Sequence, residues 1–318
     1  MSATPITIDA PTAAADHMRS TMTAVRVSIR WFGVRKTLTP QQKEQAAESF
    51  GAAGEFISAG KKLLDTRHPA YKAVTAVRGQ ITAYWKGMTL PFPEPGMRLI
   101  RQNQIEDFNA RMTELREDLE EALDQLDRQF LVIKAAAQQR LGELYNESDY
   151  PETLRGMFAV EWDFPSVEPP QYLRQLAPEI WQEQCARVSA RFDEAVQMAE
   201  EAFTEELASL VSHITERLAG DGPGGKPKIF RDSAVTNLRE FFDRFRSLNV
   251  RSSEQLDQLV DQAQDAVRGV VPQDLRDNSA LRQQIAAQMT NVRESLDEML
   301  VDRPRRKILR RPVTEEVA

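Results

Sequence analysis

Apolar residues recur every three or four positions along FNARMTELREDLEEALDQLDRQF, residues 108–130. Charged or amide side chains occupy nearly all positions between them, which is the pattern of a helix with one narrow apolar stripe. The stripe contains Phe108, Met112, Leu115, Leu119, Leu126 and Phe130. A stripe this narrow, close to two positions in seven, is typical of a coiled coil.

The pattern predicts two long helices that face one another. We expect the first from Met97 to about Tyr145, which at 1.5 Å per residue would be roughly 70 Å long. We expect the second from about residue 170 to 219, joined to the first by an irregular tip at 146–171. Its stripe contains Val188, Phe192, Phe203 and Leu210. The two helices are expected to form an antiparallel hairpin, closed within one chain or exchanged with a second.

Two short segments alternate instead, as half-buried strands do. They are VRVSIRWF, residues 25–32, and FAVEWDF, residues 158–164. Their apolar sides include Val27, Ile29, Trp31, Val160 and Trp162. A lone strand leaves backbone groups without partners, so each segment needs a neighbour. The two could pair with each other, arginine opposite glutamate or aspartate, or with copies in a neighbouring subunit.

The expected fold class is mainly all-α: a long coiled-coil hairpin, a small helical C-terminal domain and at most one short two-stranded β element. The expected segments are a flexible arm at 1–24, a strand with helices at 25–96, the hairpin at 97–219, the C-terminal domain at 228–302 and a basic tail at 303–318. Within 25–96, helices are predicted over 40–64 and 69–85, followed by a proline-rich connector at 87–96.

Composition agrees with long helices and narrows the cellular setting. Of 318 residues, 41% are hydrophobic and 28% are charged, and only 14 are glycine. The single cysteine, Cys185, excludes an intrachain disulfide. No window approaches the ~20 apolar residues of a membrane span, and the first 24 residues lack the pattern of a signal peptide. A protein without membrane segments, located in the cytoplasm, is expected.

Charge is distributed unevenly along the chain. Residues 1–104 carry 14 basic and 7 acidic groups, whereas residues 105–225 carry 10 basic and 26 acidic groups. One interpretation is that the acidic groups of the middle segment simply lie on helix faces that contact water. The other is that the basic N-terminal part of one subunit contacts the acidic middle of another, since complementary fields favour such contacts.

The tail is the most concentrated charge signal. Its basic residues are Arg303, Arg305, Arg306, Lys307, Arg310 and Arg311. Such a cluster can bind nucleic-acid phosphates, or an acidic protein surface such as this protein's own helices. It can equally be a solvated end of a helix.

No pattern indicates catalysis, a cofactor or a metal. GPGGK at 222–226 lacks the spacing and the Ser or Thr of a phosphate loop. The carboxylates include no pair marked by an apolar setting, and Cys185 and His213 have no second ligand nearby in sequence. We therefore expect a protein that is not an enzyme and needs no cofactor.

Several segments together resemble an uncharacterised family of phage and prophage proteins, a domain of unknown function often encoded beside MoxR-type AAA+ ATPases. They are VRVSIRWFGVRKTL (25–38), GKKLLD (60–65), the proline-rich block after Tyr-Trp-Lys-Gly (84–96), the long central helices and KIFRDSAVTNLREFFDRFRSLNV (228–250). The resemblance covers about residues 25–270. It implies a phage-type gene and an ATPase as partner, and it brings no catalytic residues.

Three functions remain open from the sequence. The first is a structural protein that assembles with copies of itself through coiled-coil and charge-complementary contacts. The second is an adaptor or partner of a MoxR-type AAA+ ATPase. The third is a nucleic-acid-binding accessory protein that uses its basic regions.

Overall fold

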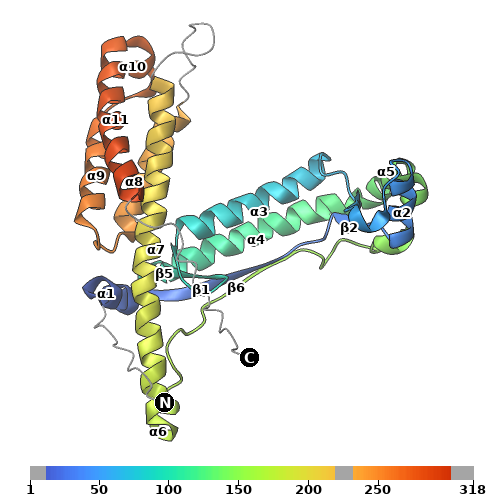
Figure 1. The fold of residues 1–318 in the computed structure, drawn as a ribbon, viewed down its shortest axis with the longest axis horizontal. Helices are drawn as coiled ribbons and strands as arrows, with labels where there is room; N and C mark the ends of the chain where they lie inside the picture. The colour runs from blue at the N-terminus through green and yellow to red at the C-terminus, as the bar shows by residue number, and fades with distance from the viewer. Residues whose placement is uncertain (1–11, 219–231, 302–318) are drawn as a thin grey trace, which may run out of the picture. The chain divides into compact units, whose positions relative to one another are not determined.

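The computed structural model describes residues 12–218 and 232–301 (Figure 1). The chain divides into two compact units: unit 1 is Met1–Ser20 with Ala177–Ala318, and unit 2 is Thr21–Leu176. The structure is 68% helical and contains a four-stranded antiparallel sheet and a two-stranded sheet. The expected all-α fold with a long coiled coil is therefore wrong, and the fold is an α+β mixture.

The four-stranded sheet of unit 2 has the order β4-β5-β1-β6. The strands are β1 (Met22–Arg30), β4 (Leu90–Pro91), β5 (Met97–Arg101) and β6 (Ala159–Asp163). β1 pairs with β6 in the same chain, with Ile29 opposite Val160, which is one of the two arrangements that the alternating pattern left open. The exposed ion pair between Arg26 and Asp163 lies across this pairing. The other neighbour of β1 is β5, a segment that was predicted to be the start of a long helix; that prediction is wrong.

Two helices complete what we call the body of unit 2, which is the four-stranded sheet with α3 (Pro69–Gly87) and α4 (Ile105–Arg128). The stripe of α4 is buried, and the ring of Phe108 stacks on Tyr84 of α3 with centroids 5.7 Å apart. α4 ends at Arg128, and α5 (Phe130–Leu141) begins after Gln129, so the expected helix from Met97 to Tyr145 is divided. The stripe packs in one core with residues of α3 and of the sheet, whereas the apolar pattern predicted a second long helix there.

The remaining elements of unit 2 form what we call its distal end, which lies at the end of α3 and α4 away from β5 (Figure 1). They are β2 (Arg35–Thr37), α2 (Pro40–Glu48), η1 (Gly54–Phe56), β3 (Gly60–Lys62), α5, η3 (Gly142–Leu144) and η4 (Glu147–Asp149). Thr39 and Gln42 form the capping box that starts α2. The helix expected over 40–64 stops at Glu48, and β3 follows where the helix was predicted to continue. Two short helices lie elsewhere in unit 2, η2 (Gln102–Gln104) and α6 (Leu173–Leu176).

The regular elements of unit 1 are all helices among its described residues. Its helices are α1 (Ala13–Thr21), α7 (Pro178–Leu218), α8 (Ser233–Leu248), α9 (Glu254–Ala266), α10 (Pro272–Asp277) and α11 (Ser279–Val301). The stripe of α7 packs on α11, α8 and α9, and Phe203 contacts the rings of Phe241 and Phe245. Since α4 and α7 belong to different units and each packs within its own, the expected hairpin is not formed. α1 also gives regular structure to part of the segment expected to be a flexible arm.

Candidate functional site

The predicted interaction residues lie mostly in the cores of the two units. In unit 2, the stripe residues from Phe108 to Phe130 are at most 2% exposed. In unit 1, Val188, Phe192 and Phe203 are buried and Leu210 is half-buried. The strand residues Val27, Ile29, Trp31, Val160 and Trp162 belong to the core of unit 2 or pack against it. The basic tail from Arg303 to Arg311 lies outside the described residues.

The distal end of unit 2 contains an unusual two-stranded ribbon. β2 and β3 are antiparallel, and Arg35 lies opposite Lys62 while Lys36 lies opposite Lys61. Like charges directly across a ribbon destabilise it. Neighbouring residues of a strand point to opposite faces, so one basic pair lies on each face. Each pair therefore needs a negative group from elsewhere.

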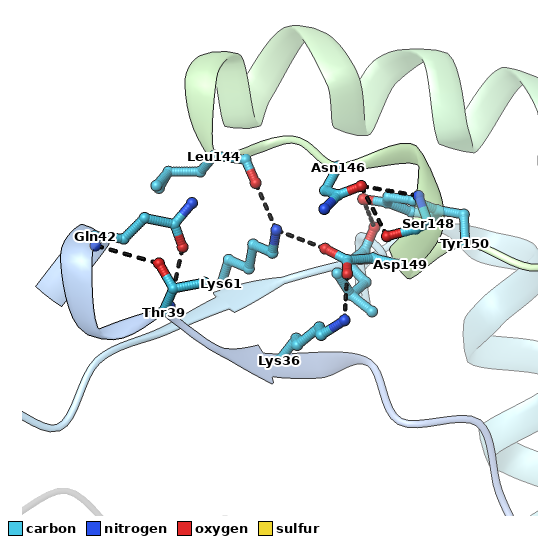
Figure 2. Close-up of polar contacts among 10 residues, drawn as sticks. Lys36, Thr39, Gln42, Lys61, Leu144, Asn146, Ser148, Asp149 and Tyr150 are labelled. Carbon is cyan, nitrogen blue, oxygen red and sulfur yellow. Dashed lines mark hydrogen bonds and ion pairs between the residues drawn. The ribbon is translucent and has the colours of Figure 1, made fainter.

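Asp149 supplies that negative group for the inner pair, Lys36 and Lys61 (Figure 2). Lys61 Nζ lies 2.5 Å from Asp149 Oδ2 and donates a hydrogen bond of 2.6 Å to the carbonyl oxygen of Leu144. Lys36 forms an ion pair with the other carboxylate oxygen. The side chains of Lys61 and Asp149 are 6% and 2% exposed, so this ion pair is buried. It joins the ribbon to η3 and η4.

The lysines keep Asp149 ionised. Burial acts to raise the pKa of its carboxyl group, but hydrogen bonds from Lys36 and Lys61 outweigh burial and hold the pKa below the ordinary value of 3.8. Two ammonium groups face one carboxylate, so the cluster carries a net positive charge. Lys36 is 54% exposed at its side chain, which leaves part of that charge in contact with water.

Local hydrogen bonds hold Asp149 in place. The side-chain oxygen of Asn146 accepts hydrogen bonds from Ser148 N at 3.0 Å and Ser148 Oγ at 2.8 Å, which fixes the start of η4. Tyr150 donates a buried hydrogen bond of 3.0 Å to the carbonyl oxygen of Leu63. Burial, followed by the nearby Tyr145 and Asp149, raises the pKa of Tyr150 to about 12. These contacts hold β3 and Leu63 against η3, η4 and Tyr150 at the distal end.

The outer pair, Arg35 and Lys62, is exposed, and neither side chain has an acidic partner among the described residues. Lys62 lines a groove of about 390 Å³ together with Arg67 and Arg140. Arg140 donates a hydrogen bond of 2.6 Å to Asp65, which also lines the groove. The apolar lining consists of Leu63, Leu64, Ile133, Ala137 and Leu141. We call this the basic groove, because a mainly positive rim surrounds an apolar floor.

The same end of unit 2 exposes large apolar side chains. Phe50 is 82% exposed, Phe56 85%, Leu131 74% and Val132 72%. Single exposed apolar residues are ordinary on protein surfaces, but several large ones on one part of a fold are typical of a contact surface. We call these four residues the apolar set.

Close packing fixes the loop that carries Phe56. The Gly54 amide donates a hydrogen bond of 2.9 Å to the side-chain carboxylate of Glu44. A Cβ atom on Gly54 would lie only 2.8 Å from the backbone nitrogen of Glu44, so no larger residue fits without displacing the loop from α2. Phe56 is thus exposed on a fixed support.

Comparison with known proteins gives no match: no family model, curated protein or solved structure is similar to this chain. Among residues 12–218 and 232–301, no helix is long and apolar enough to cross a membrane. The same residues contain no group of three or more His, Cys, Asp or Glu side chains that could hold a metal ion.

The sequence patterns did not predict the residues that distinguish the distal end, namely Lys36, Lys61, Asp149, Phe50 and Phe56. The adjacent lysines of GKKLLD, residues 60–65, were one sequence signal for the charge cluster. The other signal was GAAG at 51–54, two glycines inside a predicted helix. Gly51 has a positive φ of 64° and lies just beyond the end of α2, where glycine commonly ends a helix.

Proposed function

We propose that this chain is a non-enzymatic structural protein that assembles with copies of itself through the distal end of unit 2. The observation that supports this proposal is the apolar set, whose four large side chains are 72% to 85% exposed. They lie in a region that also contains the buried ion pair of Lys61 and Asp149. Burying a side chain such as phenylalanine in a contact contributes about 1.5–3 kcal/mol, so Phe50 and Phe56 are the expected anchors.

Charge favours a second copy as the partner. The distal ribbon presents Arg35 and Lys62 without acidic partners among the described residues, while residues 105–225 carry 26 acidic and 10 basic groups. A chain that carries both an excess-positive and an excess-negative surface can bind its own copies. The apolar stripes do not enter this proposal, because α4 and α7 bury them inside their own units.

The test is molar mass by light scattering over a range of protein concentrations. The wild-type mass should rise well above the 36.1 kDa of one chain. The double variant Phe50→Ser/Phe56→Ser should stay near that mass at every concentration. Leu176→Ser is the matched control, because Leu176 is 78% exposed, belongs to unit 2 and lies outside the distal end. This control should assemble as the wild type does.

Two results would contradict the proposal. A wild-type protein that remains a single chain at all concentrations has no self-assembly, and the exposed surface would then point to a different partner, such as the AAA+ ATPase that the family resemblance implies. Assembly that is unchanged in Phe50→Ser/Phe56→Ser would mean that another surface makes the contact.

A further inference from the structure

The ribbon beside the basic groove has an unbalanced pair of charges: Lys62 lines the groove, and Arg35 is its neighbour on β2. Arg35 and Lys62 lie directly opposite one another across the ribbon, on the face away from Asp149. Both are exposed and have no acidic partner among the described residues. Asp149 relieves the repulsion of the inner pair, but nothing in the described structure relieves that of the outer pair. An acidic partner would remove that repulsion on binding.

α4 carries the opposite imbalance. Glu117, Glu120 and Glu121 are exposed on one turn of this helix, and none has a basic partner among the described residues. Glu117 and Glu121 are four positions apart, so they project from the same face. Nearby Glu114 differs, because it is already paired with Arg111 at 2.7 Å. The glutamates of α4 thus form an exposed acidic surface, which we call the acidic turn.

We infer that the basic groove of one chain receives the acidic turn of a second copy, with Arg35 and Lys62 opposite Glu117 and Glu121. This inference rests on the proposed function and specifies which surfaces meet. The apolar floor of the groove accommodates the methylene groups of the glutamates, while their carboxylates reach the positive rim.

The two surfaces belong to the same unit but are different patches, so the contact is heterologous. Repetition of a heterologous contact produces a ring if the rotation closes and a filament if it does not. Since the charged groups are exposed, salt should weaken the contact, as charges are screened over about 10 Å at 0.1 M ionic strength.

Charge reversal with complementation tests the inference. Arg35→Glu/Lys62→Glu makes the outer pair negative, and because it preserves a like-charge pair across the ribbon, the internal repulsion is matched to the wild type. Glu117→Lys/Glu121→Lys makes the acidic turn positive. Each variant alone should remain a single chain, because its two contact surfaces now carry the same sign. A 1:1 mixture should co-assemble to wild-type masses, since each variant's altered surface complements the other's.

Lys72→Glu/Lys86→Glu is the control for a general charge effect, because these lysines are exposed on α3 of the same unit. It should assemble as the wild type does. Circular dichroism establishes that each reversal variant is folded. If one is not, the milder Lys62→Gln and Glu121→Gln replace the reversals, and each should weaken assembly several-fold.

The outcomes separate this inference from the proposed function. If the wild type and both reversal variants all assemble, the pairing of groove and acidic turn is overturned while self-assembly stands. If the reversals block assembly but their mixture does not restore it, the two surfaces do not contact each other, which also overturns the inference. If the wild type itself never assembles, the proposed function fails and this inference fails with it.

Discussion

The body and the distal end of unit 2 differ in the exposure of their aromatic side chains and of their ion pairs. In the body, Phe108 and Met112 are fully buried, while the ion pair of Arg26 and Asp163 lies at the surface with side chains 46% and 50% exposed. At the distal end, Phe56 is 85% exposed, while the ion pair of Lys61 and Asp149 is almost completely buried.

This difference teaches what each region contributes. Burial of apolar surface is the main favourable term in folding, so the core, which spans the body and includes Leu63, Leu64 and Ile133 of the distal end, supplies the stability of unit 2. A buried ion pair costs desolvation and adds little net stability, but it defines one geometry when all its partners are present. The distal end therefore combines a buried ion pair, which fixes its geometry, with the apolar set, whose four side chains remain exposed.

The largest expected difference comes from truncating one phenylalanine in each region. Phe108→Ala should destabilise unit 2 by about 3–5 kcal/mol, because it leaves a cavity in a packed core. Phe56→Ala should change stability by less than about 0.5 kcal/mol, because its ring is already in solvent. Urea unfolding measures both. A large loss in Phe56→Ala would mean that this ring belongs to the core.

A second comparison removes one carboxylate charge in each region. Asp149→Asn should cost about 3–5 kcal/mol, because it leaves the buried Lys61 without its counter-ion. Asp163→Asn is the control and should cost much less, since its partner Arg26 is solvated. In Asp149→Asn, hydrogen exchange should show that backbone amides lose protection in β2, β3 and η4. Equal effects of the two substitutions would contradict a special role for the buried pair.

Acid should affect the distal end through the same aspartate. The pKa of Asp149 lies below its ordinary value of 3.8 in the folded protein. The unfolded chain therefore binds this proton more readily, and the stability contributed by Asp149 is complete above that value and is lost as the pH falls below it. The unfolding midpoint should therefore fall as the pH is lowered below about 3.8, and this component should be missing in Asp149→Asn. If Asp149→Asn shows the same pH dependence as the wild type, Asp149 is not the group that makes the distal end sensitive to acid.

The smallest expected effect is a gain in stability. Arg35→Glu replaces a like-charge pair across the ribbon with an opposite-charge pair, and this should stabilise the distal end by about 0.2–0.5 kcal/mol. The same change should weaken assembly, because it removes positive charge beside Lys62, which lines the basic groove. Thermal unfolding and light scattering measure the two effects separately. A variant that is less stable would contradict the register of β2 and β3.

The sequence pattern predicted which face of each long helix is buried, but it could not tell what covers that face. The stripes of α4 and α7 are alike in spacing, so they were paired with each other, whereas each packs within its own unit. β5 was missed because Met97–Arg101 precedes α4 without a strong helix breaker between them. The helix predicted over 40–64 ends at Glu48, shortly before Gly51, which adopts a positive φ.

The candidate site was harder to foresee for a physical reason. Lys36 and Asp149 are 113 positions apart, and charged residues occur throughout this chain. Nothing in a single sequence distinguishes a carboxylate that will be buried between two lysines from one on a solvated helix. Phe50 and Phe56 were not predicted to be exposed either, because aromatic residues in a predicted helix are ordinarily counted toward its core.

The central claim is that the distal end of unit 2 contacts another copy of the chain. The most direct test places a photoreactive amino acid at position 56 of the full chain and, as a control, at position 176. Irradiation at position 56 should yield cross-linked dimers whose fraction rises with protein concentration, and position 176 should yield few. If position 56 gives no cross-links between chains at concentrations where light scattering detects assembly, the distal end is not the contact surface.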